Sequence, residues 1–303
     1  MVATPQSIRA AESEGKRPGG RSSRTLMTWL GVLPFFVFIA LFLLGPSVSL
    51  VVGAFQDEAG GFTLANMRSL FEAQVLGAYK TTIALSALTA FLGGVFGGIL
   101  AYAALTGGTP RWVRPLLTTF SGVAANFAGV PLAFAFIATL GTTGLVTQFL
   151  NDALGLDLYG GGFSLFTFWG LAIIYLYFQI PLMILVIAPA IDGLRREWRE
   201  AASNLGASPF QYWRYVGLPI LGPSLLGAMV LLFANAFASY ATPYALTSGQ
   251  VNIVPVLIGQ TFQGDVFSNP HQGHALALGM VVIIAFSTII YTLLQRRAAR
   301  WSR

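Results

Sequence analysis

The sequence predicts an all-α, polytopic membrane protein with six transmembrane helices, and two observations lead to that fold class. Of the 303 residues, 55% are hydrophobic and only 9% are Asp, Glu, Lys or Arg, whereas soluble domains carry roughly 25% charged residues. The 17 basic and 11 acidic residues are also confined to a few clusters between long apolar stretches. Lipid is therefore the expected solvent for most of the chain, which excludes a cytosolic enzyme, a secreted domain and a disordered protein.

The apolar stretches give the spans in order. Residues 1–25 are polar and rich in Gly, Ser and Arg, and they predict a disordered N-terminal tail. The charge-free stretch from Leu26 to Phe55 exceeds the roughly 7–15 apolar residues of a cleaved signal peptide, so it predicts a permanent first span. The other stretches each have the ~20 residues that a helix needs to cross a bilayer; they lie at 78–106, 114–140, 165–191, 217–241 and 275–294. Residues 26–303 are thus predicted to form one six-span domain.

The positive charges predict the orientation of the chain. With six spans, fifteen of the seventeen basic residues fall on one side, and only Arg68 and Lys80 fall opposite. Because cytoplasmic loops are enriched in Lys and Arg, both termini are expected to lie in the cytoplasm. The membrane expected for such a chain is the inner (cytoplasmic) membrane. The basic side comprises Arg9, Lys16, Arg17, Arg21, Arg24, Arg111, Arg114, Arg195, Arg196, Arg199, Arg214, Arg296, Arg297, Arg300 and Arg303. The net charge of +6 then reflects topology, and no nucleic-acid partner is expected.

The outer connections predict little chemistry. Residues 141–164 and 242–274 mix Gly, Pro and apolar residues, a pattern that predicts short interfacial helices or partly re-entrant segments. His271 and His274 fall in the second of these, near Asp265, but two further ligands for a metal site are missing. Cysteine is absent. We therefore expect solvated loop histidines, no metal and no cofactor.

A few polar residues fall inside the predicted spans. Asn126, Gln179 and Asn235 carry amides, which in lipid must find a partner, so each either joins neighbouring helices or lines a translocation path. No Asp or Glu lies in a span interior, which argues against a proton-coupled carrier. The glycines at 93, 94, 97 and 98 form two overlapping G-x-x-x-G pairs and predict close helix packing.

The loop at 192–217 has the clearest local pattern. Residues 195–205 are good helix formers, and Gly206 is a typical stop because glycine adopts the left-handed conformation easily. Ser208 then fits as an N-cap, with Pro209 at N1 and Gln211 at N3, which completes a capping box. The pattern predicts two short helices joined by a sharp corner at Gly206-Ala207, with Leu218-Pro219 starting the fifth span.

Enzymatic activity is not expected. The only Gly-Lys pair is Gly15-Lys16, and Arg17 follows it, so the chain has no G-x-x-x-x-G-K-[ST] loop to bind ATP phosphates. No histidine falls inside a predicted span to serve an intramembrane serine nucleophile.

The same loop resembles a known family. Glu200-Ala201-Ala202, then Gly206, then Val216-x-Leu218-Pro219 is similar to the E-A-A–G–I-x-L-P signature of the integral membrane permeases of type I bacterial ATP-binding cassette (ABC) importers, with Val216 in place of Ile. The resemblance implies a permease bundle forming half of a pore, coupled to two separate ATPase subunits, a second permease chain and an extracytoplasmic binding protein. Carried onto this chain, the coupling residues are Glu200, Ala201, Ala202, Gly206, Ala207, Ser208, Pro209, Leu218 and Pro219.

The solute is predicted only by a weaker resemblance. The segment Gly61–Phe71 is similar to the one before the second span in importers of polyamines, iron(III), thiamine and aminoethylphosphonate. It implies uptake of a small polar solute, with a polyamine-like organic cation as the first expectation and a paralogue, or else a copy, as pore partner. The alternative to the importer is a stand-alone secondary carrier or channel.

Overall fold

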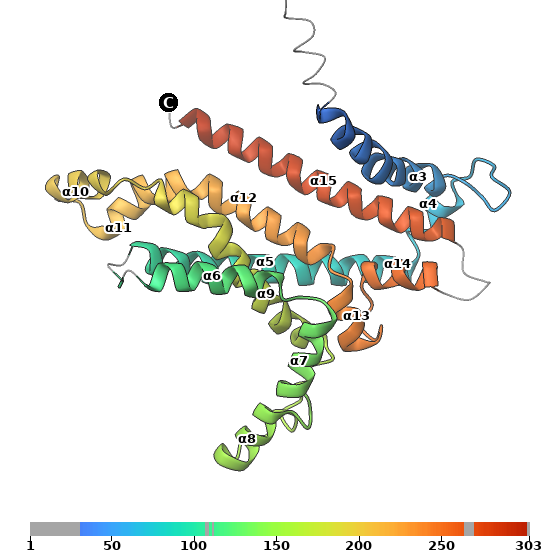
Figure 1. The fold of residues 1–303 in the computed structure, drawn as a ribbon, viewed down its shortest axis with the longest axis horizontal. Helices are drawn as coiled ribbons and strands as arrows, with labels where there is room; N and C mark the ends of the chain where they lie inside the picture. Colours follow the sequence, from blue (N-terminus) through green and yellow to red (C-terminus); the bar gives the residue numbers. More distant parts are fainter. Residues whose placement is uncertain (1–30, 107–108, 111, 264–269, 302–303) are drawn as a thin grey trace, which may run out of the picture. The chain divides into compact units, whose positions relative to one another are not determined.

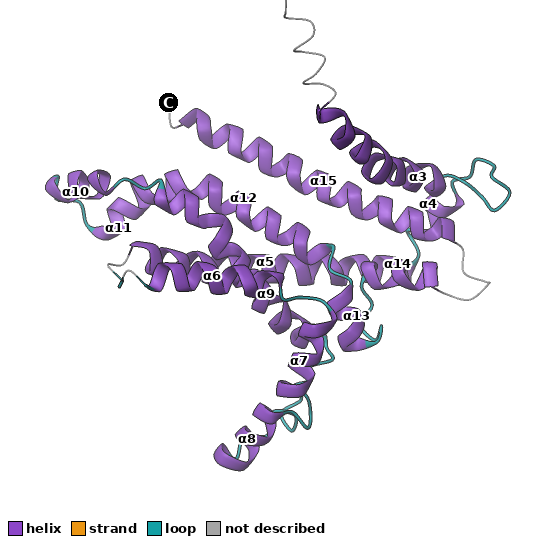
Figure 2. Ribbon diagram, in the orientation of Figure 1, coloured by secondary structure: helices purple, strands orange, loops and turns teal. Residues whose placement is uncertain are grey.

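The computed structural model describes residues 31–106, 109–110, 112–263 and 270–301. Within these residues the chain is helical apart from connecting loops and one isolated β-bridge between Gln56 and Phe62 (Figures 1 and 2). Six helical segments are long and apolar enough to cross a membrane. The prediction of an all-α fold with six candidate spans is confirmed. The predicted tail, residues 1–25, lies outside the described residues, as do Arg111 and Asp265.

The chain divides between Val52 and Gly53 into two compact units. The described part of the first unit is one helix starting at Gly31, which contains a π-helical turn η1 (Ala40–Leu44) followed by α3 (Gly45–Ala54). Pro46 has no N–H to donate to the carbonyl of Phe42, so a normal turn would leave that acceptor unpaired. The wider turn, in which the Gly45 N–H reaches the Ala40 carbonyl, accommodates this proline.

Three helices form the centre of the second unit: α5 (Ala73–Thr106), α9 (Phe168–Asp192) and α12 (Leu218–Phe237). Glycines of α5 let them approach closely. A Cβ added at Gly97 would lie 2.6 Å from Met183 Cβ and 2.8 Å from the Ile180 carbonyl oxygen, both on α9. A Cβ at Gly94 would lie 2.7 Å from Met229 on α12. The predicted packing role of this glycine stripe is confirmed.

The predicted third span, 114–140, is wrong as a continuous helix. The chain forms α6 (Val113–Asn126) and α7 (Val130–Leu140), and the two run in different directions in Figure 1. Gly129 between them has φ +77°, which ends the helix, and Pro131 cannot donate to the carbonyl of Phe127. Thr242 fixes the break, because its Oγ1 accepts the Gly129 N–H at 2.8 Å. The candidate span begins after it and covers Val130–Leu154, including α8 (Leu145–Leu154).

Further short helices lie between the candidate spans. Two of them, α13 (Ala241–Thr247) and α14 (Val254–Gln263), fall in the connection 242–274 where short helices were predicted, and α4 (Ala65–Ser69) lies in a connection for which none was predicted. The last helix, α15, runs Pro270–Trp301 and so begins five residues before the predicted 275. His271 and His274 therefore lie on its first turns rather than in a loop, and the His271 ring nitrogen Nδ1 lies 3.0 Å from the Gly53 carbonyl oxygen.

Candidate functional site

The candidate site is an elbow, defined as residues 196–212, at one end of the second unit. It consists of α10 (Arg196–Asn204) and α11 (Pro209–Tyr212), joined by a four-residue corner (Figure 1). Beside it, Arg114 at the start of α6 and Asp192 at the end of α9 form an ion pair with a nitrogen–oxygen distance of 2.5 Å. The predicted pair of short helices is confirmed.

The corner closes as a complete Schellman motif. The Ala207 N–H donates to the Ala202 carbonyl at 3.0 Å and the Gly206 N–H donates to the Ser203 carbonyl at 2.9 Å. These two bonds satisfy carbonyls that the end of α10 would otherwise leave unpaired. The motif requires a left-handed residue, and Gly206 adopts it at φ +76°. Gly206 therefore sets the angle between the two arms of the elbow.

The second arm starts with the predicted capping box. The Gln211 N–H donates to Ser208 Oγ at 3.3 Å, and the Ser208 N–H donates to Gln211 Oε1 at 2.7 Å. Pro209 occupies the first helical position, where no N–H is needed. Such caps stabilise a helix terminus by roughly 1 kcal/mol. The elbow is thus shaped before any partner binds.

The second arm also continues directly into the fifth candidate span. After α11 comes a π-helical turn η2 (Trp213–Gly217) and then α12, so the span begins at Pro209. The expectation that Leu218-Pro219 starts this span is wrong, because the wide turn carries the helix through them without a break. The Trp213 ring packs edge-on against Tyr102 of α5, with ring centroids 4.7 Å apart. The elbow is therefore joined to α12 by a continuous helix, and the residue that follows it contacts α5.

The elbow presents its predicted residues on one accessible surface. Glu200 and Ala201 are exposed, Ala202 and Ala207 are half-buried, and Ser208 and Pro209 are exposed at the corner. Among the described residues, Glu200 forms no ion pair within the elbow. The structure brings Glu200, Ala201, Ala202, Gly206, Ala207, Ser208 and Pro209 together, whereas Leu218 and Pro219 lie farther along the continuous helix.

Two apolar side chains of the elbow were not identified from sequence. Leu205, the first residue of the corner, is 87% exposed, and Phe210, two residues after the corner, is 71% exposed. Large apolar side chains that no other part of the chain covers can contribute to a protein-binding surface. The only sequence signal was their position in an otherwise polar loop.

The three amides in the spans have different surroundings. Gln179 is fully buried, and its Nε2 donates to the Leu232 carbonyl at 3.0 Å, so it joins α9 to α12. Asn126 and Asn235 are exposed. Asn126 bonds only its own helix, to Gly122 at 2.8 Å. Asn126 is the last residue of α6, and Asn235 lies near the end of α12. The segments that follow these two helices are joined by the hydrogen bond between Gly129 and Thr242. The structure does not group Gln179 with the other two.

The site contains chemistry for binding rather than for catalysis. Within the described ranges, no three His, Cys, Asp or Glu side chains gather in a way that could hold a metal ion. The elbow instead offers a preformed turn, exposed charges on α10 and two apolar side chains. Such a surface suits the docking of another protein.

Comparisons with known proteins agree with this geometry. The sequence profile of the family described as "Binding-protein-dependent transport system inner membrane component" matches residues 93–301, which include the elbow. A probable sulfate transport system permease protein (cysT) of Nephroselmis olivacea is 28% identical over 277 residues, which cover 88% of this chain and 91% of that protein. A putative ferric transport system permease protein (FbpB 1) of Haemophilus influenzae is 24% identical over 260 residues, covering 86% of this chain and 40% of that protein.

The fold is also found among solved structures. Two crystal structures of bacterial ABC transporters for alginate match with TM-scores of 0.72 and 0.71, at 18% and 19% sequence identity. Each match covers 91% of this chain and 96% of the other. The second of them is a complex with a periplasmic protein bound to an alginate pentasaccharide. At such identities the likeness shows a shared fold.

Proposed function

The chain belongs to the family of binding-protein-dependent transport system inner membrane components and is a permease subunit of an ABC importer, and from this premise we propose that its elbow is the docking surface for a separate ATPase. ATP hydrolysis belongs to that other subunit, not to this chain. The observation that carries the proposal is the rigid elbow, whose Schellman corner and capping box are complete without a partner.

The proposed mechanism follows from helix continuity. ATP-driven closure of two ATPase subunits pulls on the elbow, and the unbroken helix from Pro209 to Phe237 carries that movement into the bundle. Trp213 against Tyr102 passes it to α5. The bundle then changes between inward- and outward-open states, and the solute biases that equilibrium through its different affinity for the two.

The proposed assembly contains three further kinds of subunit. These are two ATPases, a second permease chain and an extracytoplasmic binding protein, and the periplasmic protein bound to the alginate transporter supports the last of them. We expect a paralogue as the second permease, with a copy of this chain as the other arrangement. The basic residues at the elbow end support a bacterial inner-membrane orientation with both termini in the cytoplasm.

Replacing Phe210 by alanine is expected to weaken ATPase binding. An apolar side chain at the centre of an interface contributes about 2 kcal/mol, so the dissociation constant should rise roughly 30-fold. The measurement is a titration of the purified ATPase onto the full permease assembly in nanodiscs. Phe62→Ala is the matched control, because Phe62 is 78% exposed but lies outside the elbow.

The docking proposal fails if the Phe210→Ala and Phe62→Ala permeases bind the ATPase as tightly as the unmodified chain. It also fails if the ATPase never copurifies with the assembly in mild detergent. Solute uptake by the purified chain alone, driven by an ion gradient, would favour the stand-alone carrier instead.

We further propose that Asn126 and Asn235 line the translocation path. Each has an exposed side-chain amide, Asn126 at the end of α6 and Asn235 near the end of α12. An amide that faces lipid without a partner is unfavourable, so a water-filled path between two permease chains is the environment that suits both. Gln179 is assigned to helix packing because it is fully buried and its Nε2 bonds a second helix, whereas Asn126 is exposed and bonds only within its own helix.

The proposed solute is sulfate rather than a polyamine. The comparisons do not support the polyamine expectation, since the relatives described above are named for sulfate and ferric transport. The chain also lacks the carboxylates that a polyamine path needs: in the described residues, Asp and Glu lie outside the candidate spans or within two residues of a span end. Amide N–H groups such as those of Asn126 and Asn235 are donors that suit an oxyanion.

Deleting the chain is expected to abolish uptake of radiolabelled sulfate by intact cells, and supplying it again should restore that uptake. Labelled ferric ion and labelled spermidine, measured in the same cells, serve as controls and should enter unchanged. Loss of ferric uptake alone would assign the transporter to iron, and loss of spermidine uptake alone would restore the polyamine expectation.

A further inference from the structure

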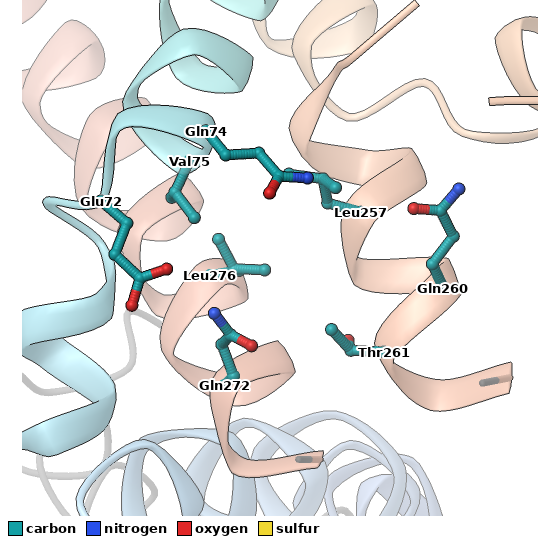
Figure 3. A pocket seen from close by; sticks show the side chains of 8 residues that line it. All are labelled: Glu72, Gln74, Val75, Leu257, Gln260, Thr261, Gln272 and Leu276. Carbon is teal, nitrogen blue, oxygen red and sulfur yellow. The ribbon is translucent and has the colours of Figure 1, made fainter. Parts of the chain in front are cut away.

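A polar pocket lies at the end of α5 remote from the elbow. It is a cavity of about 250 Å³ between the start of α5, α14 and the start of α15 (Figure 3). Its rim carries one carboxylate, three amides and one hydroxyl, from Glu72, Gln74, Gln260, Gln272 and Thr261. In Figure 3 these side chains surround a common space. None of the residues assigned to ATPase docking or to the path lies here.

The polar groups of the rim are free to bind a partner. Within the part of the chain that the structure describes, the Glu72 carboxylate makes no ion pair. The side-chain amides of Gln74 and Gln272 likewise have no bonded partner there, and both point into the space in Figure 3. Thr261 Oγ1 donates to the Ile258 carbonyl at 2.7 Å, which leaves its lone pairs available as acceptors. The pocket therefore offers one negative charge, together with the oxygens and the N–H groups of three side-chain amides.

The floor of the pocket is apolar. Val75 and Leu276 form it, at 5% and 2% exposure, and both belong to the buried cluster that contains Tyr79. The Tyr79 hydroxyl donates to the Leu276 carbonyl at 2.6 Å and ties the two helices together beneath the cavity. The pocket is therefore built on a packed part of the bundle, which suits it to anchoring a partner.

The size and chemistry of the pocket indicate which kind of group fits it. At about 250 Å³ it is smaller than the roughly 300–1,000 Å³ of sites for drug-sized ligands, so it fits a single side chain. A carboxylate with side-chain amides beside it can accept hydrogen bonds from a group that has several N–H donors and a positive charge. The apolar floor suits the aliphatic stem that Arg and Lys carry below their charged heads.

We propose that this pocket receives an arginine or lysine side chain of the extracytoplasmic binding protein, with Glu72 as its counter-charge. The proposal rests on the proposed function, in which such a protein delivers the solute to this face. Of the described residues that line the pocket, Glu72 is the one that carries a charge, so a basic side chain of the partner would meet its counter-charge there.

The test uses the full transporter in proteoliposomes, with the binding protein that supports its uptake purified from the same cells. Stimulation of ATPase activity is followed as the binding protein is titrated. Glu72→Gln should raise the half-saturating concentration about tenfold, the effect of losing one charge-assisted hydrogen bond. The maximal rate should not change, because the machinery for coupling is intact. Glu58→Gln, an exposed outer carboxylate outside the pocket, should behave like the unmodified chain.

Each other outcome has a defined meaning. If Glu72→Gln, Glu58→Gln and the unmodified chain titrate alike, the pocket proposal is overturned while the proposed function stands. If the binding protein does not stimulate the ATPase activity of the unmodified transporter at all, the proposed function fails, and the pocket proposal fails because it rests on that function. A lowered maximal rate at an unchanged half-saturating concentration would place Glu72 on the route of the solute and overturn docking. Restoration of a Glu72→Lys transporter by an Arg→Glu or Lys→Glu binding protein would identify the partner side chain.

Discussion

Replacing Gly206 by valine is expected to reduce ATP-driven uptake roughly tenfold or more while the chain still inserts in the membrane. Gly206 holds φ +76° in the Schellman corner, and an L-residue there costs about 1–2 kcal/mol. Since the proposed docking requires the bent elbow, the apparent affinity for the ATPase should fall in proportion to the population that keeps the bend. The measurement is uptake in cells, normalised to the amount of permease in the membrane.

The chain offers a matched control in Gly155. It also ends a helix, α8, in the left-handed conformation at φ +62°, and an added Cβ meets nothing within 4 Å at either glycine. Valine at Gly155 therefore imposes the same local strain at a position outside the elbow. Gly155→Val should keep uptake near that of the unmodified chain. Equal losses for the two variants would mean that strain alone, and not the elbow, explains the effect.

Replacing Gly97 by alanine is expected to destabilise the bundle by about 1–3 kcal/mol, the usual cost of overpacking a core. The new Cβ would lie 2.6 Å from Met183 Cβ and 2.8 Å from the Ile180 carbonyl oxygen. The second neighbour is backbone, so a rotamer change cannot relieve the clash and α5 must move away from α9. The expected result is a lower midpoint of thermal unfolding for the detergent-solubilised assembly, followed by size-exclusion chromatography.

The neighbouring Gly98→Ala variant is the control. Its Cβ would lie 3.4 Å from the end of the Leu225 side chain and 3.7 Å from the end of Met183, which are ordinary contacts. Both variants gain the same helix propensity from glycine to alanine, so the difference between them isolates the packing against α9. Gly98→Ala should unfold at or above the temperature of the unmodified chain. Coinciding midpoints would show that the stripe at Gly97 is not tightly packed.

The parts of the fold that sequence predicts well depend on local rules. The elbow is such a part, since Gly206, Ser208 and Gln211 satisfy backbone groups within a few residues of themselves. The number of spans is another, because hydropathy and charge spacing follow from the solvent. The packing role of the glycine stripe of α5 was also predicted from sequence, although the residues that pack against it, Met183 and Met229, were not.

The parts that sequence predicts poorly depend on distant contacts. The break at Gly129 lies in an unbroken apolar run, and the residue that fixes it, Thr242, is 113 positions away in the chain. The start of the fifth span was placed too late because Arg214 made the segment read as loop, whereas a wide helical turn passes through it. Leu205 and Phe210 were missed because exposure of an apolar side chain is decided by the surrounding fold.

The wide turn at Trp213–Gly217 has a consequence for which sequence deletions the chain tolerates. It holds one residue more than an α-helical turn, and each residue of a helix advances the direction of its side chain by about 100°. Loss of one residue there would leave a regular α-helical turn, so the elbow would keep its direction relative to α12. A one-residue deletion is therefore expected to be tolerated at this turn, whereas the same deletion in the regular part of α12 would rotate the elbow by about 100° around the helix axis.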